Sequence, residues 1–386
     1  MLKERVEMRK CIVTILVSLF LLSAAFLTEL GSPVTVNSNS ISSSNPNRRL
    51  LAIYGKAYLE SISGLLVLHV KGSPYEMGYQ NGFLLRDAIK AMINYTIQNR
   101  IDRGFSYEYQ VNCSQAMEPH IPQEYIQEMH GLADGAGVNY TDVLIVHTHP
   151  EMGGYGTNWT GCSGFAVFGN ATIDGHLYHG RNFDWTLPSQ PCGLVTVYEP
   201  ESGNTFVNVG LFGYIAALSG MNKKGISLGL KTSESSDITL DGMPIRFILR
   251  KVLQYSNNLT EVINIMNQTD RTTGWNVILG DGSNLNACAV EMSDNYCKVF
   301  WAGDPAEDIS PHYSIEDAVR RTNHFVDTEL SATQRSPYDP RDSSFFMNWS
   351  WNRYEKLGEI VLGNYSNIDS DLSIQFLQTY PVGGFF

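Results

Sequence analysis

The sequence is poor in positive charge. Its 27 Lys and Arg residues are outnumbered by 39 Asp and Glu residues, which gives a formal net charge of -12. Beyond the first twenty residues, basic side chains occur at most in adjacent pairs such as Arg48-Arg49. Because binding to a phosphate backbone requires concentrated Lys and Arg, these features exclude a nucleic-acid partner.

Internal repeats, low-complexity tracts and heptad series are absent after residue 50. No P-loop lysine follows Gly280-Asp281-Gly282, so this segment predicts a hairpin turn and not a phosphate-binding loop. An apolar content of 43% with 17% charged residues is typical of a globular protein that buries a core. A chain of 386 residues suffices for one large domain or two modest ones.

The N-terminus has the composition of an export signal. Basic residues precede an uncharged apolar run from Cys11 to Leu27, whose length lies between a signal-peptide core and a bilayer span. We therefore expect residues 1–31 to be either a signal peptide or an N-terminal membrane anchor, followed by a flexible linker over residues 32–49. Both interpretations predict a secreted or extracytoplasmic protein, in the second case anchored to the membrane through residues 11–27.

Potential N-glycosylation sites favour the same compartment. Nine N-x-Ser/Thr sequons fit a glycoprotein if the chain is exported. They begin at Asn94, Asn112, Asn139, Asn158, Asn170, Asn258, Asn267, Asn348 and Asn364.

Cysteine is scarce, and after Cys11 the remaining number is odd. In an oxidising compartment most cysteines form disulfides, so an odd number predicts one free thiol. Cys288 and Cys297 flank an expected hairpin and could pair locally, while Cys113 and Cys192 could form a second bridge. This pairing leaves Cys162 free, although spacing alone does not fix the connectivity.

Patterns of hydrophobicity predict an α+β protein. Ser73-Pro74-Tyr75-Glu76 forms a capping box that begins a helix reaching about residue 98, and a second helix covers about 122–133. From Cys162 onward the pattern changes to strands. Strands are expected near residues 65–71, 165–168, 177–178, 195–199, 205–209, 226–230, 276–279 and 287–292, and helices near 244–255, 259–266 and 351–362. This order suggests two packed sheets with helices outside.

Cys162, Arg181 and Asp184 are expected near one another across the hairpin that follows Cys162. A two-residue turn at Asp174-Gly175 would place Asp184 opposite Phe165, about 10 Å along the strand from Cys162. The thiolate of a cysteine is a nucleophile, and the free α-amine of an N-terminal residue can act as its base. Gly161 has no side chain and allows the close approach that self-cleavage before Cys162 requires.

At these residues the sequence resembles the N-terminal-nucleophile (Ntn) hydrolases. It is most similar to the isopenicillin-N acyltransferase, acid ceramidase and N-acylethanolamine acid amidase type, and more distantly similar to conjugated bile acid hydrolases. The similarity extends over roughly residues 50–365 and is carried by several ordered motifs. They are Gly161-Cys162, the segments 72–82, 175–185 and 220–225, and Arg321-Thr322-Asn323-His324-Phe325.

This resemblance implies a four-layer αββα sandwich and a set of site residues. Cys162 matches the nucleophile that becomes N-terminal after autocleavage between Gly161 and Cys162. Arg181 and Asp184 match catalytic-centre residues, Asn323 matches an oxyanion donor, and Arg353 matches a late arginine. Residues 50–161 would then be the N-terminal chain and residues 162–386 the catalytic chain, and the two would remain associated.

Two departures from the family pattern count against full activity. Lys231 stands where relatives often carry an asparagine that donates to the oxyanion. The chain ends at residues 383–386, Gly-Gly-Phe-Phe, where relatives usually continue.

The function expected from the resemblance is hydrolysis or transfer of the acyl group of a small-molecule or lipid N-acyl amide through a Cys162 thioester. The alternatives are a phospholipase B-like ester hydrolase and a non-catalytic secreted ligand-binding glycoprotein of the same fold. No cofactor is expected. His147-x-His149 with Glu151 has the spacing of a partial zinc site, but a full ligand set is not evident, and we expect no metal.

Overall fold

A computed structural model describes residues 47–152, 161–184, 193–335 and 345–382 of the chain. The expected signal or anchor, most of the expected linker, Cys192 and the sequon at Asn158 lie outside these residues. The last two residues assigned to the linker, Arg48 and Arg49, belong to the first strand. No helix within the described ranges is long and apolar enough to cross a membrane.

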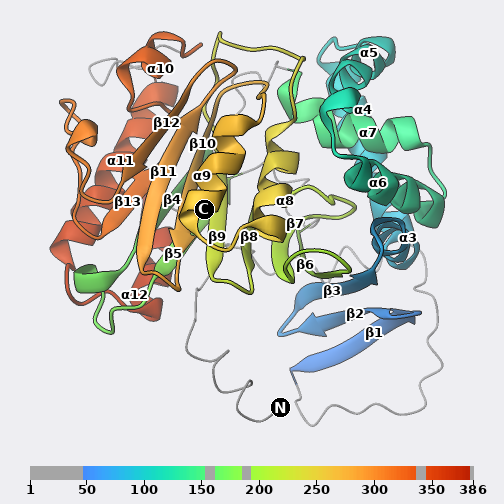
Figure 1. The fold of residues 1–386 in the computed structure, drawn as a ribbon, viewed down its shortest axis with the longest axis horizontal. Helices are drawn as coiled ribbons and strands as arrows, with labels where there is room; N and C mark the ends of the chain where they lie inside the picture. The colour runs from blue at the N-terminus through green and yellow to red at the C-terminus, as the bar shows by residue number, and fades with distance from the viewer. Residues whose placement is uncertain (1–46, 153–160, 185–192, 336–344, 383–386) are drawn as a thin grey trace.

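A ten-stranded sheet forms the centre of the molecule (Figure 1). Its pairs are antiparallel except for β3 with β6, which are parallel. In spatial order, its strands are β1 (Arg48–Tyr54), β2 (Ala57–Ile62), β3 (Leu65–Gly72), β6 (Gly193–Pro200), β7 (Phe206–Leu211), β8 (Ser219–Asn222), β9 (Ile226–Thr232), β10 (Trp275–Asp281), β11 (Asn286–Met292) and β12 (Cys297–Trp301).

A second sheet of three strands packs face to face on the β9–β11 part of the first. Its order is β13 (Ala318–Arg321), β4 (Gly161–Val167) and β5 (Tyr178–Asp184). Alternation along β4 directs Ala166 toward the large sheet, where it packs with Ile278, and directs Phe165 toward the opposite side. The space between the sheets is therefore built from every second residue of β4 and β5.

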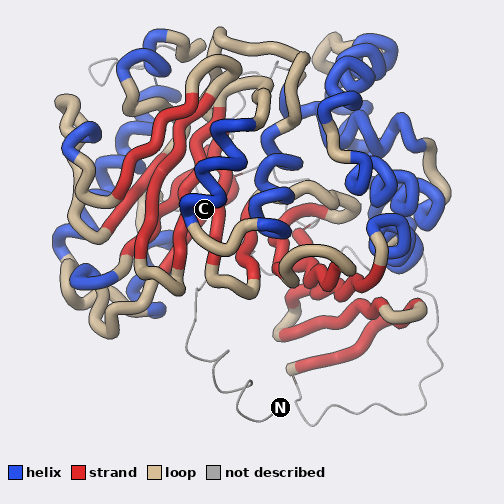
Figure 2. The backbone as a smooth tube through the Cα atoms, viewed as in Figure 1, coloured by secondary structure: helices blue, strands red, loops and turns tan. Residues whose placement is uncertain are grey.

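Helices cover both outer faces. Helices α8 (Ile245–Tyr255) and α9 (Leu259–Gln268) pack on the large sheet, with Phe247 and Val262 in the same core as Leu228. On the small sheet, α11 (Phe345–Gly363) and α12 (Ser370–Gln378) place Leu357 and Phe376 against Phe165. The layers are thus helix, sheet, sheet, helix, and the predicted αββα sandwich is confirmed (Figure 2).

The remaining helices come largely from the N-terminal part of the chain, and they gather near β1–β3 at the right of Figure 1. They are α3 (Pro74–Leu84), α4 (Arg86–Asp102), α5 (Tyr107–Met117), α6 (Gln123–Ala136) and α7 (Tyr140–Thr148); a short α10 (Thr328–Ala332) follows β13. The predicted capping box is present, because Ser73 and Glu76 bond to each other's backbone. The single helix expected over 73–98 is two helices, which meet at Leu85.

The β4–β5 pairing differs from the predicted two-residue hairpin. Asp184 lies opposite Gly161 and Arg181 opposite Gly164, a shift of four residues from the expected partners. The connection is longer because residues 169–171 form a 3-10 turn that Asp317 holds, by accepting hydrogen bonds from the Phe168 and Asn170 amides. The observed register brings Asp184 directly beside the start of β4.

The predicted local disulfide between Cys288 and Cys297 is wrong. Cys288 pairs with Trp301 across β11 and β12, whereas Cys297 pairs with Met292, so the two cysteines lie far apart along the hairpin. Both thiols are free, as are those of Cys113 and Cys162.

Helices α3 and α6 cross through glycines. A methyl group on Gly78 would lie 1.9 Å from the Glu128 carbonyl oxygen, and one on Gly131 would lie 2.1 Å from the Tyr75 carbonyl oxygen. Gly82 and Gly135, one turn further along each helix, are equally confined. The two backbones therefore touch directly, and side chains cannot be added without separating the helices.

We expect Gly131→Ala to lower the free energy of unfolding by about 1–3 kcal/mol, because overpacking outweighs the gain in helix propensity. Urea denaturation monitored by circular dichroism measures the change. Gly363→Ala is the control: this glycine is the last residue of α11, and a methyl group there would meet nothing within 4 Å. Equal effects of the two substitutions would contradict the close crossing.

Candidate active site

Cys162 lies at the start of β4, with its side chain between the two sheets. It is 3% exposed and pairs with Phe183 of β5. Cys162 has the same parity along β4 as Gly164 and Ala166, both of which face the large sheet. The small sheet thus presents the thiol to the strands β8–β10.

Arg181, on the neighbouring strand β5, contacts the sulfur of Cys162. Its NH2 nitrogen lies 3.6 Å from Cys162 Sγ, while Nε donates to the Leu230 carbonyl at 3.0 Å and NH1 to Ser219 Oγ at 2.9 Å. Burial lowers the pKa of Arg181, and the adjacent Cys162 opposes this shift. A guanidinium fixed by two acceptors on the large sheet is placed to stabilise a thiolate at Cys162.

Asn323 and Arg353 fix the backbone of Cys162. The Cys162 amide donates to Asn323 Oδ1 at 2.8 Å, and Arg353 NH2 donates to the same oxygen at 2.7 Å. Arg353 NH1 donates to the Cys162 carbonyl oxygen. Asn323 Nδ2 donates to the Thr232 carbonyl at 2.7 Å, which leaves its second hydrogen for another acceptor.

Asp184 lies across the strand pair from Gly161, the residue before the thiol. Its Oδ2 is 3.8 Å from Arg353 NH1, and the side chain is 21% exposed. Burial raises the pKa of Asp184, and Arg353 and Arg181 oppose that shift. The structure therefore brings all five predicted residues together: Cys162, Arg181, Asp184, Asn323 and Arg353.

Gly161 also has a confined position. A methyl group on this residue would lie 2.9 Å from Arg353 NH2. A larger residue at this position would displace the Arg353 guanidinium.

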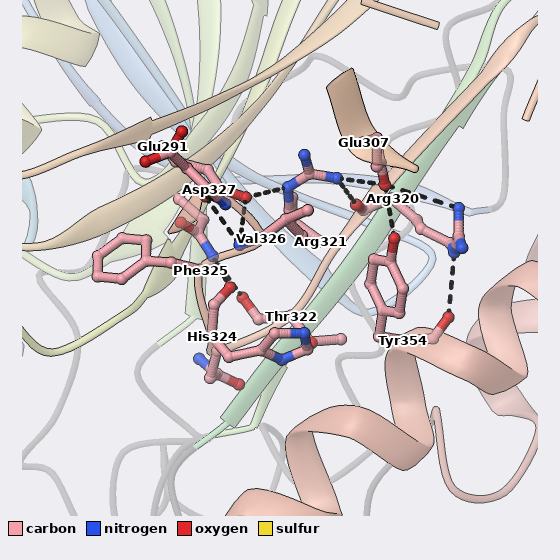
Figure 3. A network of polar contacts seen from close by, with 12 residues as sticks. Glu291, Glu307, Arg320, Arg321, Thr322, His324, Phe325, Val326, Asp327 and Tyr354 are labelled. Carbon is pink, nitrogen blue, oxygen red and sulfur yellow. Dashed lines mark hydrogen bonds and ion pairs between the residues drawn. The ribbon is translucent and has the colours of Figure 1, made fainter. Parts of the chain in front are cut away.

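A buried charge network positions Asn323, and sequence reasoning did not anticipate it (Figure 3). Arg321 bonds to Glu291 at 2.6 Å and to Glu307 at 2.9 Å, and Glu291 also accepts the Val326 and Asp327 amides. These contacts fix both ends of the segment 321–327.

Asn276 of β10 supports the same segment from the large sheet. Its Nδ2 donates to the Thr322 carbonyl at 3.2 Å and to the His324 carbonyl at 2.7 Å, on either side of Asn323. The motif 321–325 identifies this segment in the sequence. Glu291, Glu307 and Asn276 lie at no recognisable spacing from the motif, so the sequence does not predict their contacts with it.

Lys231, noted as a departure from the family pattern, is buried between the sheets beside the site. Its Nζ donates to the Gly229 carbonyl at 3.1 Å, and a methyl group on Gly164 would lie 2.7 Å from Nζ. Burial and the charge of Arg181 hold the pKa of Lys231 well below its usual range. Both effects favour the neutral form of the amine, and the Gly229 carbonyl accepts its hydrogen bond.

His147, His149 and Glu151 are engaged in structural bonds. The Nδ1 atoms of His147 and His149 bond to the carbonyls of Val143 and Val146. Glu151 accepts hydrogen bonds from the Ile245 amide, Thr272 and Trp275. Within the described parts of the chain, no three His, Cys, Asp or Glu side chains are grouped so as to hold a metal ion.

Comparison with a protein-family model identifies the family of the chain. The model described as acyl-coenzyme A:6-aminopenicillanic acid acyl-transferase matches residues 171–376, more than half of the chain. The chain belongs to this family. The matched region contains Arg181, Asp184, Asn323 and Arg353, whereas Cys162 lies nine residues before it. The resemblance to this type of Ntn hydrolase, drawn from the motifs, is confirmed.

Individual relatives are distant. An uncharacterized protein of Archaeoglobus fulgidus is 26% identical over 80% of this chain, and protein dcd1B of Dictyostelium discoideum is 30% identical over 67%. The chain spans only 56% and 57% of the lengths of these two relatives. Rat acid ceramidase is 24% identical over 44% of this chain and 48% of its own.

Solved structures also show similarity. The Caenorhabditis elegans N-acylethanolamine-hydrolyzing acid amidase ortholog has a TM-score of 0.41 and 17% identity, over 58% of this chain and 88% of its own. A conjugated bile acid hydrolase mutant from Clostridium perfringens has a TM-score of 0.34 and 16% identity, over 56% of this chain and 78% of its own.

A double-mutant cycle measures the coupling energy of the ion pair between Arg353 and Asp184. We expect Arg353→Met alone to cost about 3 kcal/mol or more, because it leaves Asp184 and the Cys162 carbonyl without their buried partner. Combining it with Asp184→Asn should reveal a coupling of about 1–2 kcal/mol in the free energy of unfolding. The exposed pair Lys356 and Glu359 on the same helix is the control, with an expected coupling below about 0.5 kcal/mol. A coupling near zero for the first pair would refute the role of Arg353 in neutralising Asp184.

Because the His147 ring is buried, we expect the protein to lose stability on mild acidification. Its Nε2 accepts from the Ile215 amide at 3.1 Å, so the buried ring is neutral, and burial lowers the pKa of His147 to about 4. The unfolded ring, with a pKa of about 6.5, takes up its proton first. Stability is therefore lost as the pH falls from about 6.5 to 4, by about 3 kcal/mol for this group.

Urea denaturation at several pH values measures this dependence. His147→Gln should be less stable at pH 7 but should show a smaller decline with acidification than the wild type. His176→Gln changes an exposed histidine and should follow the wild-type slope. An unchanged slope in His147→Gln would contradict a neutral buried ring.

Proposed function

We propose that the protein is a self-processing cysteine hydrolase that cleaves N-acyl amides through a thioester on Cys162. The observation that carries this proposal is the placement of the Cys162 sulfur beside Arg181, with the Cys162 nitrogen bonded to Asn323 and with Asp184 opposite the preceding residue, Gly161. Family membership supports acyl-group chemistry in general.

Self-processing begins with attack of the Cys162 sulfur on the Gly161 carbonyl carbon. The Gly161–Cys162 C–N bond breaks, a thioester forms, and the Cys162 nitrogen takes up a proton as a free amine. Water then hydrolyses the thioester and releases the Gly161 carboxylate and the Cys162 thiol. The absence of a side chain on Gly161 leaves room for this rearrangement beside Arg353.

In the mature enzyme, the α-amine of Cys162 accepts the thiol proton, and the sulfur attacks the carbonyl carbon of the substrate amide. Asp184 lies where it can bind the resulting ammonium, and Arg181 stabilises the thiolate before attack. The second hydrogen of Asn323 Nδ2 is available to the oxyanion. Collapse of the intermediate breaks the C–N bond, the ammonium protonates the leaving amine, and water hydrolyses the thioester to the acid.

We further propose that the two chains formed by cleavage stay together and that the enzyme acts outside the cytoplasm. Strands β1–β3 precede the cleavage point, and β3 pairs with β6, which follows it. Cleavage would therefore leave one continuous sheet formed by both chains. The N-terminal apolar run and the sequons support export, either as a secreted protein or as one anchored through residues 11–27.

The decisive test is the state of the purified protein. Wild type should migrate as two fragments, and N-terminal sequencing of the larger should begin at Cys162. Cys162→Ala should remain intact and inactive, whereas Cys113→Ala, a buried free cysteine distant in the sequence, should be cleaved normally. An intact wild-type chain would refute self-processing.

Substrate class is tested with the cleaved enzyme. It should release fatty acid from N-acyl amides in preference to phospholipids, measured by mass spectrometry. Preference for phospholipids would favour an ester hydrolase of the same fold, and a cleaved protein without turnover would favour a ligand-binding role.

A further inference from the structure

Lys231 is a fully buried amine between the two sheets, and no other lysine within the described ranges is buried. Leu230 points into the helix-covered core of the large sheet, so alternation along β9 directs Lys231 toward the small sheet. Its Nζ lies against Gly164 of β4, where a methyl group would be only 2.7 Å away. Gly164 thus leaves the space that the amine occupies.

Lys231 lies between the two anchors of the nucleophile. The carbonyl before it on β9 accepts from Arg181, which contacts Cys162 Sγ, and the carbonyl after it accepts from Asn323, which binds the Cys162 amide. Gly164, against which Nζ packs, follows Cys162 on the same face of β4, about 7 Å along the strand. A proton therefore has a short path between sulfur and Nζ, after rotation of the lysine side chain or through one water.

The groups around Lys231 favour its neutral form. Burial and the cations Arg181 on β5 and Arg321 on β13 lower the pKa of Lys231, and burial also lowers the pKa of the neighbouring His179. Among the described residues, no carboxylate lies within ion-pair distance of the amine. Cys162 acts in the opposite sense, because a thiolate there would favour the ammonium form of Lys231. The amine is thus suited to take up a proton when the thiol loses one.

The first step of self-processing needs such an acceptor. The α-amine of Cys162 serves as the base only after cleavage, because in the intact chain its nitrogen is part of the peptide bond to Gly161. Asp184 pairs with Gly161, and both face Arg353 on the outer side of the small sheet, whereas the thiol faces the large sheet. Lys231 lies on the side of the thiol.

We propose that Lys231 accepts the thiol proton of Cys162 during self-processing and returns it to the Cys162 nitrogen. The sulfur, freed of its proton, attacks the Gly161 carbonyl carbon. Collapse of the intermediate breaks the C–N bond, and the Lys231 ammonium protonates the leaving nitrogen. Water enters only to hydrolyse the thioester. This inference rests on the proposed function and names the base of its first step.

The rate at which freshly translated, pulse-labelled full-length chain converts into two fragments tests the role of Lys231. Lys231→Met keeps the bulk of the side chain without the amine and should slow conversion about 100-fold. Lys231→Ala should also be slow, and propylamine in the buffer should accelerate it about tenfold, whereas propanol should not. Lys224→Met removes an exposed lysine from the turn before β9 and should keep the wild-type rate.

The pH dependence of the wild-type rate is a second measurement. Burial and Arg181 hold the pKa of Lys231 well below its usual range, so the neutral amine is present at mildly alkaline pH and the rate should level off there. Below this pKa, Lys231 already carries a proton, and the rate should fall. A rate that climbs about tenfold per pH unit up to about pH 9 would show that hydroxide ionises the thiol, which would overturn the inference.

The outcomes separate this inference from the function beneath it. If Lys231→Met is cleaved at the wild-type rate, or if folded Lys231→Ala gains nothing from propylamine, Lys231 does not accept the proton and self-processing stands. If the wild-type chain stays intact, the proposed function itself fails. Circular dichroism shows whether the variants fold; should neither Lys231 variant fold, the wild-type pH profile decides the question.

Discussion

The guanidinium group of Arg353 connects segments that are far apart in the sequence. From α11 it reaches the Cys162 carbonyl on β4, Asn323 after β13, and Asp184 at the end of β5. All three strands belong to the small sheet, so one side chain fixes how its strand ends meet. The backbone of Cys162 depends on this buried cation, because its carbonyl oxygen accepts from Arg353 and its amide nitrogen donates to Asn323, which Arg353 also binds.

A second cluster of buried charges supports the first. Arg321, Glu291 and Glu307 form a second cluster behind Asn323, and each carboxylate accepts from more than one donor. Buried carboxylates that accept from several donors hold the surrounding backbone in one geometry. The second cluster thus orients the Asn323 segment, and the first uses that orientation to place Cys162. The buried charges of the second cluster therefore serve to hold the geometry of the site.

Much of the fold and part of the site could be predicted from the sequence. Local signals sufficed for the capping box at Ser73, for the longer strands, and for α8 and α9, because hydrophobic periodicity and turn residues are read within a few residues. The β4–β5 register could not be predicted, since it depends on Asp317, which lies about 150 residues away and stabilises the 3-10 turn. The family motifs named the five clustered residues, but the supporting roles of Asn276 and Glu291 arise only from tertiary contacts.

The register that sequence reasoning missed is also what makes the chemistry coherent. With Asp184 opposite Phe165, as expected, the carboxylate would have been remote from the new α-amine. In the observed pairing, Asp184 faces the residue whose bond would be cut, and Arg353 lies against both. Before cleavage, burial raises the pKa of Asp184, and the ion pair with Arg353 at 3.8 Å opposes this shift. In the proposed reaction, an ammonium group formed at Cys162 would supply Asp184 with a second positive partner, so the cleaved chain would match the charge of the site better than the intact one.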